Sequence, residues 1–317
     1  MLFVHIPKTA GTSFRESIEE VVASRSRRFR KVERDYGAGA GVTTAAVKEA
    51  TYGLKDVSRL IIKAPDITFM TGHYSIMRYL PHYGIGRVCT FVRDPVSRVV
   101  SEYLHARRHH GATDDFEAFY RQPNMQNRQW KLLAGQPLGC MGAVGITERY
   151  EESLKVINAR FDLRLETRTA NANSATRVEY KDLISLHRES IEKINKQDLH
   201  LYRQANMLLD SRLKVLAMGE APLAYRTDKH PHAISGYVWW PDSDDMVELE
   251  VCRIDAEGRC TMAMDDILAK EFSAEAHGLG APRKGYVGFR FGTGRLKPGQ
   301  YCLREVTSLQ VVLDFKQ

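Results

Sequence analysis

The stretch that decides the fold lies at the N-terminus, where Leu2–Phe14 reads "LFVHIPKTAGTSF". An apolar run ends at Pro-Lys-Thr-Ala-Gly-Thr-Ser, and the amphipathic segment "RESIEEVV" follows it. This order predicts a buried strand, a tight turn and a helix that begins at Thr12. Backbone N–H groups at the start of such a helix, together with the helix dipole, form an anion site. The lysine precedes the glycine, so the Walker A spacing G-x-x-x-x-G-K-[ST] is absent.

The turn itself supplies groups that suit an anion. Gly11 allows the backbone to approach a ligand closely, and Lys8 adds a positive point charge. Thr12 and Ser13 add hydroxyl donors in the first helical turn. The same pattern also fits an ordinary strand–helix turn with a Thr or Ser cap. The loop alone therefore leaves both interpretations open.

A second strand–helix junction occurs in Cys89–Tyr103, "CTFVRDPVSRVVSEY". Arg93 ends the predicted strand, Asp94 is the expected N-cap and Pro95 is the first helical residue. Ser101 follows about two turns later, so Arg93 and Ser101 could bind one phosphate at the sheet edge where open α/β folds bind ligands. Alternatively, Arg93 pairs with an acidic neighbour and Ser101 lies on the helix surface.

The order of predicted elements divides the chain into two domains. Up to about Ala221, apolar strands alternate with amphipathic helices, which predicts βαβ units and a parallel sheet flanked by helices. From Ile234, strands follow one another with Gly, Pro and Asp between them, which predicts a smaller antiparallel β-sandwich. We place the domains at residues 1–230 and 231–317. Trp239 and Trp240 are adjacent on a predicted strand, so one could stack on a sugar or pack at the domain interface.

Composition narrows the class of protein and ligand. The chain has 317 residues, of which 43% are hydrophobic and 27% charged, as in soluble globular proteins. No apolar run approaches the ~18 residues of a transmembrane helix, and no signal peptide is recognisable. The five cysteines lack CxxC or zinc spacing, which favours free thiols in a reducing cytoplasm. The net charge of +7 arises before Ile234, because 10 Lys+Arg and 13 Asp+Glu follow from there, and it favours an anionic ligand.

Two of these stretches, "HIPKTAGTSF" and "FVRDPVSRVVSEY", resemble the 5′-phosphosulfate and 3′-phosphate loops of sulfotransferases that use 3′-phosphoadenosine 5′-phosphosulfate (PAPS). The likeness is to carbohydrate O-sulfotransferases of the heparan/uronosyl 2-O type and their bacterial relatives, over roughly the first 215 residues. Ala10 stands where many relatives carry a second glycine, and the membrane anchor of the Golgi members is absent. Further similar pieces, in the same order, are Thr71–Ser75, Asn124–Gly135, Val144–Leu154 and Asn195–Ala205.

The resemblance implies a P-loop NTPase-like fold, PAPS as donor, PAP as product and no required metal. Lys8 would neutralise the charge that builds on the bridging oxygen as PAP leaves. Arg93 and Ser101 would hold the 3′-phosphate, which distinguishes PAPS from ATP. The 5′-phosphate would be held by the N–H groups and hydroxyls of Thr9, Ala10, Gly11, Thr12 and Ser13.

The resemblance also implies residues on the acceptor side. His73, in "TFMTGHYS", matches the family's general base, and a histidine suits that role near neutral pH. His5 is an alternative base, although its place on the first strand favours packing. Arg177 lies where relatives place a loop that closes over the nucleotide, so it could add charge at the 3′-phosphate. Asn127 and Arg128 lie where relatives approach the acceptor; either arginine could equally be a surface residue.

We therefore expect a PAPS-dependent O-sulfotransferase of bacterial type, cytoplasmic or peripheral at the inner membrane, acting on an acidic or neutral saccharide and not on nucleic acid. A nucleotide kinase is one alternative, but it needs Mg²⁺ and a lysine after the glycine. A non-catalytic nucleotide- or glycan-binding protein is another. Lys8 and His73 together disfavour it, because binding alone does not need a base. The oligomeric state is not predicted.

Overall fold

The computed structural model describes residues 1–24, 31–52, 68–110, 115–167 and 174–317; at 110 and 174–177 it describes only the backbone. The chain forms two compact units. The boundary predicted near residue 230 falls inside the second, at the end of a strand. The first unit contains Met1–His82, Val88–Gln136 and Ala143–Asp210, and the second contains Tyr83–Arg87, Pro137–Gly142 and Ser211–Gln317.

The first unit is built on a five-stranded parallel sheet of order β2-β3-β1-β4-β5. All residues of β1, β3, β4 and β5 are buried, which explains why these strands are continuous apolar runs in the sequence. The parallel α/β prediction is therefore confirmed. The strands are β1 (Leu2–Val4), β2 (Lys31–Asp35), β3 (Thr68–Gly72), β4 (Val88–Val92) and β5 (Ala143–Ile146).

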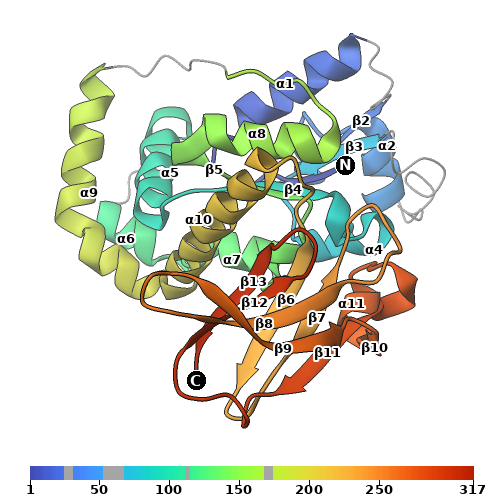
Figure 1. Cartoon of the computed structure of the whole chain (residues 1–317). Coiled ribbons are helices and arrows are strands. Elements are labelled where there is room, and N and C mark those ends of the chain that lie inside the picture. Colours follow the sequence, from blue (N-terminus) through green and yellow to red (C-terminus); the bar gives the residue numbers. More distant parts are fainter. Residues whose placement is uncertain (25–30, 53–67, 111–114, 168–173) are drawn as a thin grey trace. The chain divides into compact units, whose positions relative to one another are not determined.

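Helices flank this sheet (Figure 1). Phe14 of α1 and Ile157 of α8 belong to one apolar cluster with Phe3 and Phe91 of the sheet, while α5, α6 and α9 share a second cluster. The helices are α1 (Gly11–Ala23), α2 (Ala45–Val47), α4 (Leu80–Tyr83), α5 (Pro95–His110), α6 (Phe116–Arg121), α7 (Arg128–Leu133), α8 (Tyr150–Phe161), α9 (Ser174–Ile194) and α10 (Lys196–Ala217). Shorter turns are η1 (Lys48–Tyr52), η3 (Ile76–Arg78), η4 (Ile85–Arg87), η5 (Leu138–Cys140) and η6 (Thr147–Arg149).

The start of α5 follows the sequence prediction. The helix begins at Pro95, and the carboxylate of Asp94 accepts the backbone N–H of Ser97 at 2.8 Å. Asp94 is therefore the N-cap. The apolar run "RLIIKA" at 59–64, which predicts a further strand, lies outside the described residues, as does the basic run "RSRRFRK" at 25–31 apart from Lys31.

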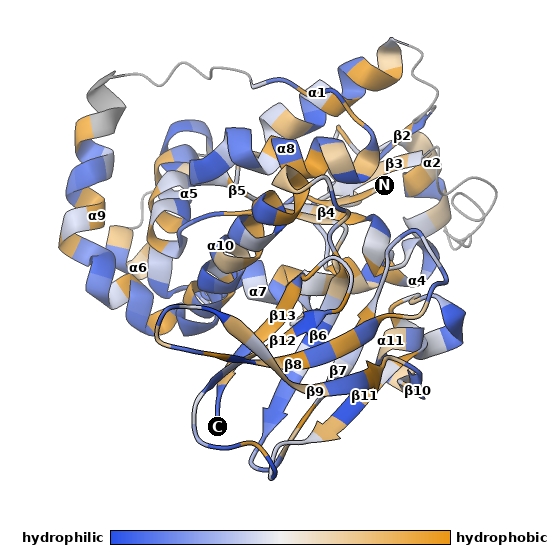
Figure 2. Ribbon diagram, in the orientation of Figure 1, coloured by the Kyte–Doolittle hydropathy of each residue, from blue (hydrophilic) through white to orange (hydrophobic). Residues whose placement is uncertain are grey.

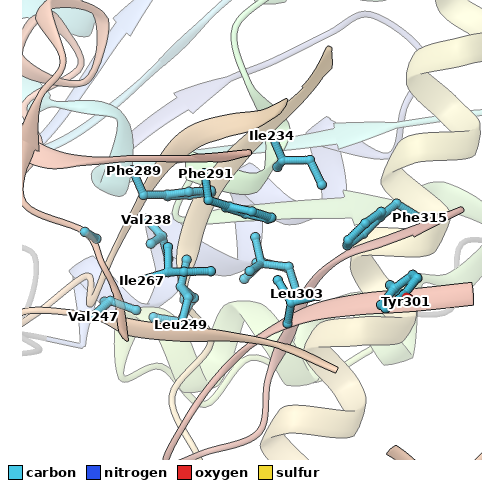
Figure 3. Close-up of a cluster of buried hydrophobic side chains, with 14 residues drawn as sticks. Ile234, Val238, Val247, Leu249, Ile267, Phe289, Phe291, Tyr301, Leu303 and Phe315 are labelled. Atoms are coloured by element: carbon cyan, nitrogen blue, oxygen red, sulfur yellow. The ribbon is translucent and has the colours of Figure 1, made fainter. Parts of the chain in front are cut away.

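The second unit is an antiparallel β-sandwich, as predicted. Its four-stranded sheets have the orders β10-β11-β7-β6 and β13-β12-β8-β9. Figure 3 shows side chains of both sheets, such as Phe289 and Leu303, meeting in one apolar core. The elements are β6 (Ala224–His230), β7 (Ala233–Trp239), β8 (Glu248–Ile254), β9 (Cys260–Leu268), β10 (Glu271–Phe272), α11 (Ala274–Gly278), η7 (Arg283–Gly285), β11 (Tyr286–Gly292), β12 (Gln300–Glu305) and β13 (Val311–Lys316).

The two adjacent tryptophans of the sandwich are buried to different extents. Trp239 is 4% exposed and lies beside Tyr237, with ring centroids 5.9 Å apart. Trp240 is partly buried against the sandwich core. Trp239 is therefore excluded from stacking on a sugar, and such a role for the partly exposed Trp240 stays a prediction.

Polar and apolar residues alternate along the helices (Figure 2). Within the described ranges, no helix combines the length and the apolar character needed to cross a bilayer. All five cysteines are free thiols.

Candidate functional site

The loop between β1 and α1 has an unusual backbone. Lys8 and Ala10 both adopt the left-handed conformation, with φ of 66° and 64°. Ala10 is the N-cap of α1 and makes no side-chain capping hydrogen bond, so no side chain of the cap covers the N–H groups of the first turn. Gly11 packs against His5, because a Cβ at Gly11 would lie 2.1 Å from His5 Cδ2. The glycine is therefore required by this close approach inside the protein.

The three hydroxyl residues of the loop have different environments. Thr9 is fully buried, and its hydroxyl donates to the carbonyl of Ile6 at 2.9 Å. Thr9 therefore closes the turn with its side chain. Thr12 is exposed and Ser13 is half-buried in the first turn of α1.

Arg93, at the end of β4, contacts this loop directly. Its Nη1 donates to the carbonyl of Lys8 at 3.0 Å, and its Nη2 donates to the hydroxyl of Tyr180 at 2.9 Å. The buried amide of Gln129 holds the Arg93 backbone, accepting its N–H and donating to its carbonyl, both at 2.9 Å. The fold thus brings together the two motifs that sequence reasoning singled out.

Ser101 and Arg177 are the two other residues predicted to bind the 3′-phosphate. Ser101 lies on α5, half-buried, one turn beyond Ser97. Arg177 lies in the first turn of α9, and its side chain is outside the described part of the structure. Their convergence on Arg93 stays a prediction.

His73 follows β3 and belongs to an aromatic group with His5 and Tyr36. Its backbone N–H donates to the carbonyl of Asp35 at 3.1 Å. Its ring lies edge-on to His5 and to Tyr36, with centroids 4.7 Å apart in both cases. His5 Nδ1 and the Tyr36 hydroxyl are hydrogen-bonded at 2.8 Å. Tyr36 was missed because it follows β2, whose charged sequence does not indicate a strand.

Both histidines are held in the neutral form. Burial, followed by the neighbouring His73 and Arg15, lowers the pKa of His5 from 6.5 to about 3. Loss of surrounding water, followed by the charge of Arg128, lowers the pKa of His73, while Glu102 raises it. His73 also keeps an exposed surface. Neutral imidazoles near pH 7 can accept a proton.

Glu102, on α5, connects the cations of this region. Its carboxylate pairs with Arg98 at 2.6 Å and with Arg128 at 2.5 Å. Burial lowers the pKa of Lys8, and the charge of Glu102 opposes this shift. Glu102 was not singled out from the sequence.

Asn127 has a structural task. Its side-chain Oδ1 accepts the N–H of Gln197 at 3.0 Å, and its Nδ2 donates to the carbonyl of Ile194 at 3.2 Å. Its own N–H donates to Asn195 at 2.7 Å. The amide therefore joins the start of α7 to the α9–α10 junction, and the acceptor role of Asn127 and Arg128 stays a prediction.

No group of three or more His, Cys, Asp or Glu side chains in the described ranges is arranged to hold a metal ion.

Comparison with known proteins assigns the chain to a family. A family model described as "Sulfotransferase family" matches residues 1–214. The chain belongs to the sulfotransferase family. The match contains the Lys8 loop, the Arg93 corner and His73, and it ends inside α10 before the sandwich strands.

The sulfotransferase assignment supports sulfuryl transfer to an acceptor substrate in general. No protein with a curated description matches the chain. A similar solved structure is a sulfotransferase from Alicyclobacillus acidocaldarius, with a TM-score of 0.31 and 15% identity, covering 64% of this chain and 98% of that one. At this level the likeness adds nothing to the family assignment.

Proposed function

We propose that this sulfotransferase moves a sulfuryl group from PAPS to a hydroxyl of a saccharide. The observation that supports the proposal best is the contact between Arg93 and the carbonyl of Lys8. It joins the loop expected at the 5′-phosphosulfate to the corner expected at the 3′-phosphate. A donor with charged groups at both positions can engage the two together.

The residues present fit such a donor. Arg93 Nε is buried and has no hydrogen-bond partner, so it retains donor capacity. The first turn of α1 has no side-chain cap and carries the Thr12 and Ser13 hydroxyls. In the proposal, the N–H groups of the loop, including that of Thr9, bind the 5′-phosphate, and Arg93 binds the 3′-phosphate with Ser101 and Arg177.

PAPS, when bound, supplies the activated sulfuryl group. The Lys8 ammonium then stabilises the negative charge that grows on the phosphate oxygen from which the group departs. Burial lowers the pKa of Lys8, with Arg93 and Arg108 adding to the shift, and the charge of Glu102 opposes it. Lys8 is thus the electrostatic catalyst in the proposal.

His73 removes the proton of the acceptor hydroxyl. Its lowered pKa keeps the imidazole neutral at pH 7, as a base requires. The edge-on contacts with His5 and Tyr36 orient the ring. Arg128, held by Glu102, supplies a cation that suits an acidic saccharide. The saccharide class itself follows from the resemblance to carbohydrate sulfotransferases.

Thermal melting without metal tests the donor. PAP should raise the melting temperature more than AMP does, because ligand binding stabilises the native state and only PAP carries the 3′-phosphate. Label transfer from PAPS to a panel of acidic and neutral saccharides then tests the reaction. Lys8→Ala and His73→Ala should each lower transfer by about 10² or more. Equal shifts with PAP and AMP would refute the donor assignment.

A matched control separates loss of chemistry from loss of fold. Glu117→Gln alters an exposed ion pair with Arg121 on α6 and should leave transfer unchanged. His73→Ala should still bind PAP, because His73 is assigned to the acceptor. A protein that binds PAP but transfers no label to any saccharide, with native residues in place, would favour the non-catalytic alternative.

A further inference from the structure

Glu148 lies directly beside Arg93. It belongs to η6, which follows β5, the neighbour of β4 in the sheet. Its Oε1 is 3.7 Å from Arg93 Nε and accepts the backbone N–H of Asp94 at 3.2 Å. Its Oε2 accepts the hydroxyl of Tyr202 at 3.2 Å. The carboxylate is therefore held in place from both oxygens.

The other nitrogens of Arg93 already have partners, since Nη1 donates to Lys8 and Nη2 to Tyr180. The buried Nε has no hydrogen bond, and it faces Glu148 across 3.7 Å. An anion that binds the Nε side of this guanidinium must therefore approach the carboxylate of Glu148. Two anions at that distance repel each other. The side chain of Glu148 is 36% exposed, so it can exchange a proton with solvent.

We propose that Glu148 takes up one proton from solvent when the nucleotide's 3′-phosphate binds Arg93, and that Glu148 thereby sets the donor affinity and its pH dependence. This inference rests on the proposed function. The proton moves from water to a carboxylate oxygen of Glu148, which can then donate a hydrogen bond to the phosphate. Without the proton, Glu148 occupies the electrostatic position of the phosphate on Arg93.

The surroundings favour this proton uptake. Partial burial is the main factor that raises the pKa of Glu148; hydrogen bonds from backbone N–H groups and the charge of Arg93 oppose it, and the carboxylate of Asp94 raises it further. Tyr202 remains protonated, because its own pKa is raised to about 12. The charged and titratable groups around Glu148 and Arg93 are Lys8 of the loop, Asp94 of the β4–α5 corner, Tyr180 and Arg188 of α9, and Tyr202 of α10.

Calorimetric titration with PAP and AMP tests the proposal in the full chain. At about pH 8, Glu148→Gln should bind PAP roughly tenfold more tightly than the native protein, because the amide removes the like charge. The difference should shrink as the pH falls and native Glu148 becomes protonated. AMP affinity should be equal in both proteins, since AMP lacks the 3′-phosphate. Glu117→Gln serves as the control and should bind like the native protein.

Proton uptake provides an independent measurement that needs no variant. Titrations in buffers of different ionisation enthalpy should show more proton uptake by the native protein with PAP than with AMP, and the excess should be lost in Glu148→Gln. Equal PAP affinity and equal uptake in native and Glu148→Gln proteins, with PAP still preferred over AMP, would overturn this inference alone. Loss of any preference for PAP over AMP would overturn the donor assignment as well.

Discussion

Arg93 and Arg212 show how differently two parts of this molecule use a partly or fully buried arginine. In the second unit, Arg212 donates to the carbonyls of Gly139, Met141 and Gly142 at 2.7–3.2 Å and is 5% exposed. In the first unit, Arg93 donates to one carbonyl and one hydroxyl and faces a carboxylate at 3.7 Å. The backbone carbonyls around Arg212 are fixed and do not titrate, whereas the carboxylate that faces Arg93 can be protonated. Arg212 is therefore structural, whereas Arg93 is the arginine that we propose binds a ligand.

Arg212→Met should have the largest effect on stability. It leaves three carbonyls without their donor, and at about 1–1.5 kcal/mol for each hydrogen bond the free energy of unfolding should fall by about 3–5 kcal/mol. Urea denaturation followed by circular dichroism measures this. PAP affinity of the folded fraction should be unchanged. A loss below about 1 kcal/mol would contradict the structural role.

Arg93→Met should affect nucleotide preference more than stability, the opposite of Arg212→Met. The predicted loss of stability is smaller, since fewer hydrogen bonds are removed, but the preference for PAP over AMP should fall by about 10- to 100-fold. Calorimetric titration with both nucleotides measures it. If the two variants behaved alike in stability and in nucleotide preference, the distinction between the two arginines would fail.

The pKa values of His5 and His73 provide a further test within the first unit. In NMR titration of labelled histidines, His5 should titrate near pH 3 and His73 below the ordinary value of 6.5. His73→Gln and His5→Gln assign the signals. The unfolded chain protonates His5 below about pH 6.5 while the native chain does not, so stability should decline as the pH falls from 6.5 toward 3. A pKa for His73 at or above 6.5 would remove the argument that it is a neutral base.

Ala10→Gly should give the smallest effect. The left-handed conformation costs a non-glycine residue about 1–2 kcal/mol, while glycine loses about 0.4–1 kcal/mol more chain entropy on folding. Thermal melting should therefore show a gain between about 0 and 1 kcal/mol, with unchanged PAP binding. The equivalent change at Leu309, with φ of 57° in the second unit, is the matched control. Clear destabilisation by Ala10→Gly would show that the alanine side chain itself is needed.

Local sequence was sufficient for the elements that are apolar or clearly capped. The buried strands β1, β3, β4 and β5, and the helix that begins at Pro95, were all visible from composition and capping residues. Elements that are stabilised mainly by pairing or packing with neighbouring elements were not predicted. In β9, most residues of "CTMAMDDIL" are exposed, and pairing with β8 defines the strand. The polar helix α9 and the charged strand β2 were missed for the same reason.

The candidate site divides in the same way. Lys8, Arg93 and His73 were recognisable because each lies in a short motif at the end of a strand. Tyr36 and Tyr180 were not, because neither belongs to a recognisable motif. Glu148 lies in the similar stretch Val144–Leu154, but nothing in that stretch indicates a role for this residue. The task of Asn127 in the α9–α10 junction was also hidden, since its partners lie about 70 residues away in the chain.

The sequence by itself determined the strand–turn–helix order at both junctions, because burial, turn conformation and capping depend on neighbouring residues. Only the tertiary structure decided which groups meet there. The carboxylate of Glu148 reaches Arg93 because parallel pairing sets β5 beside β4, and the Tyr180 hydroxyl reaches it from a distant helix. Such electrostatic neighbours depend on distances in space, which no local pattern encodes.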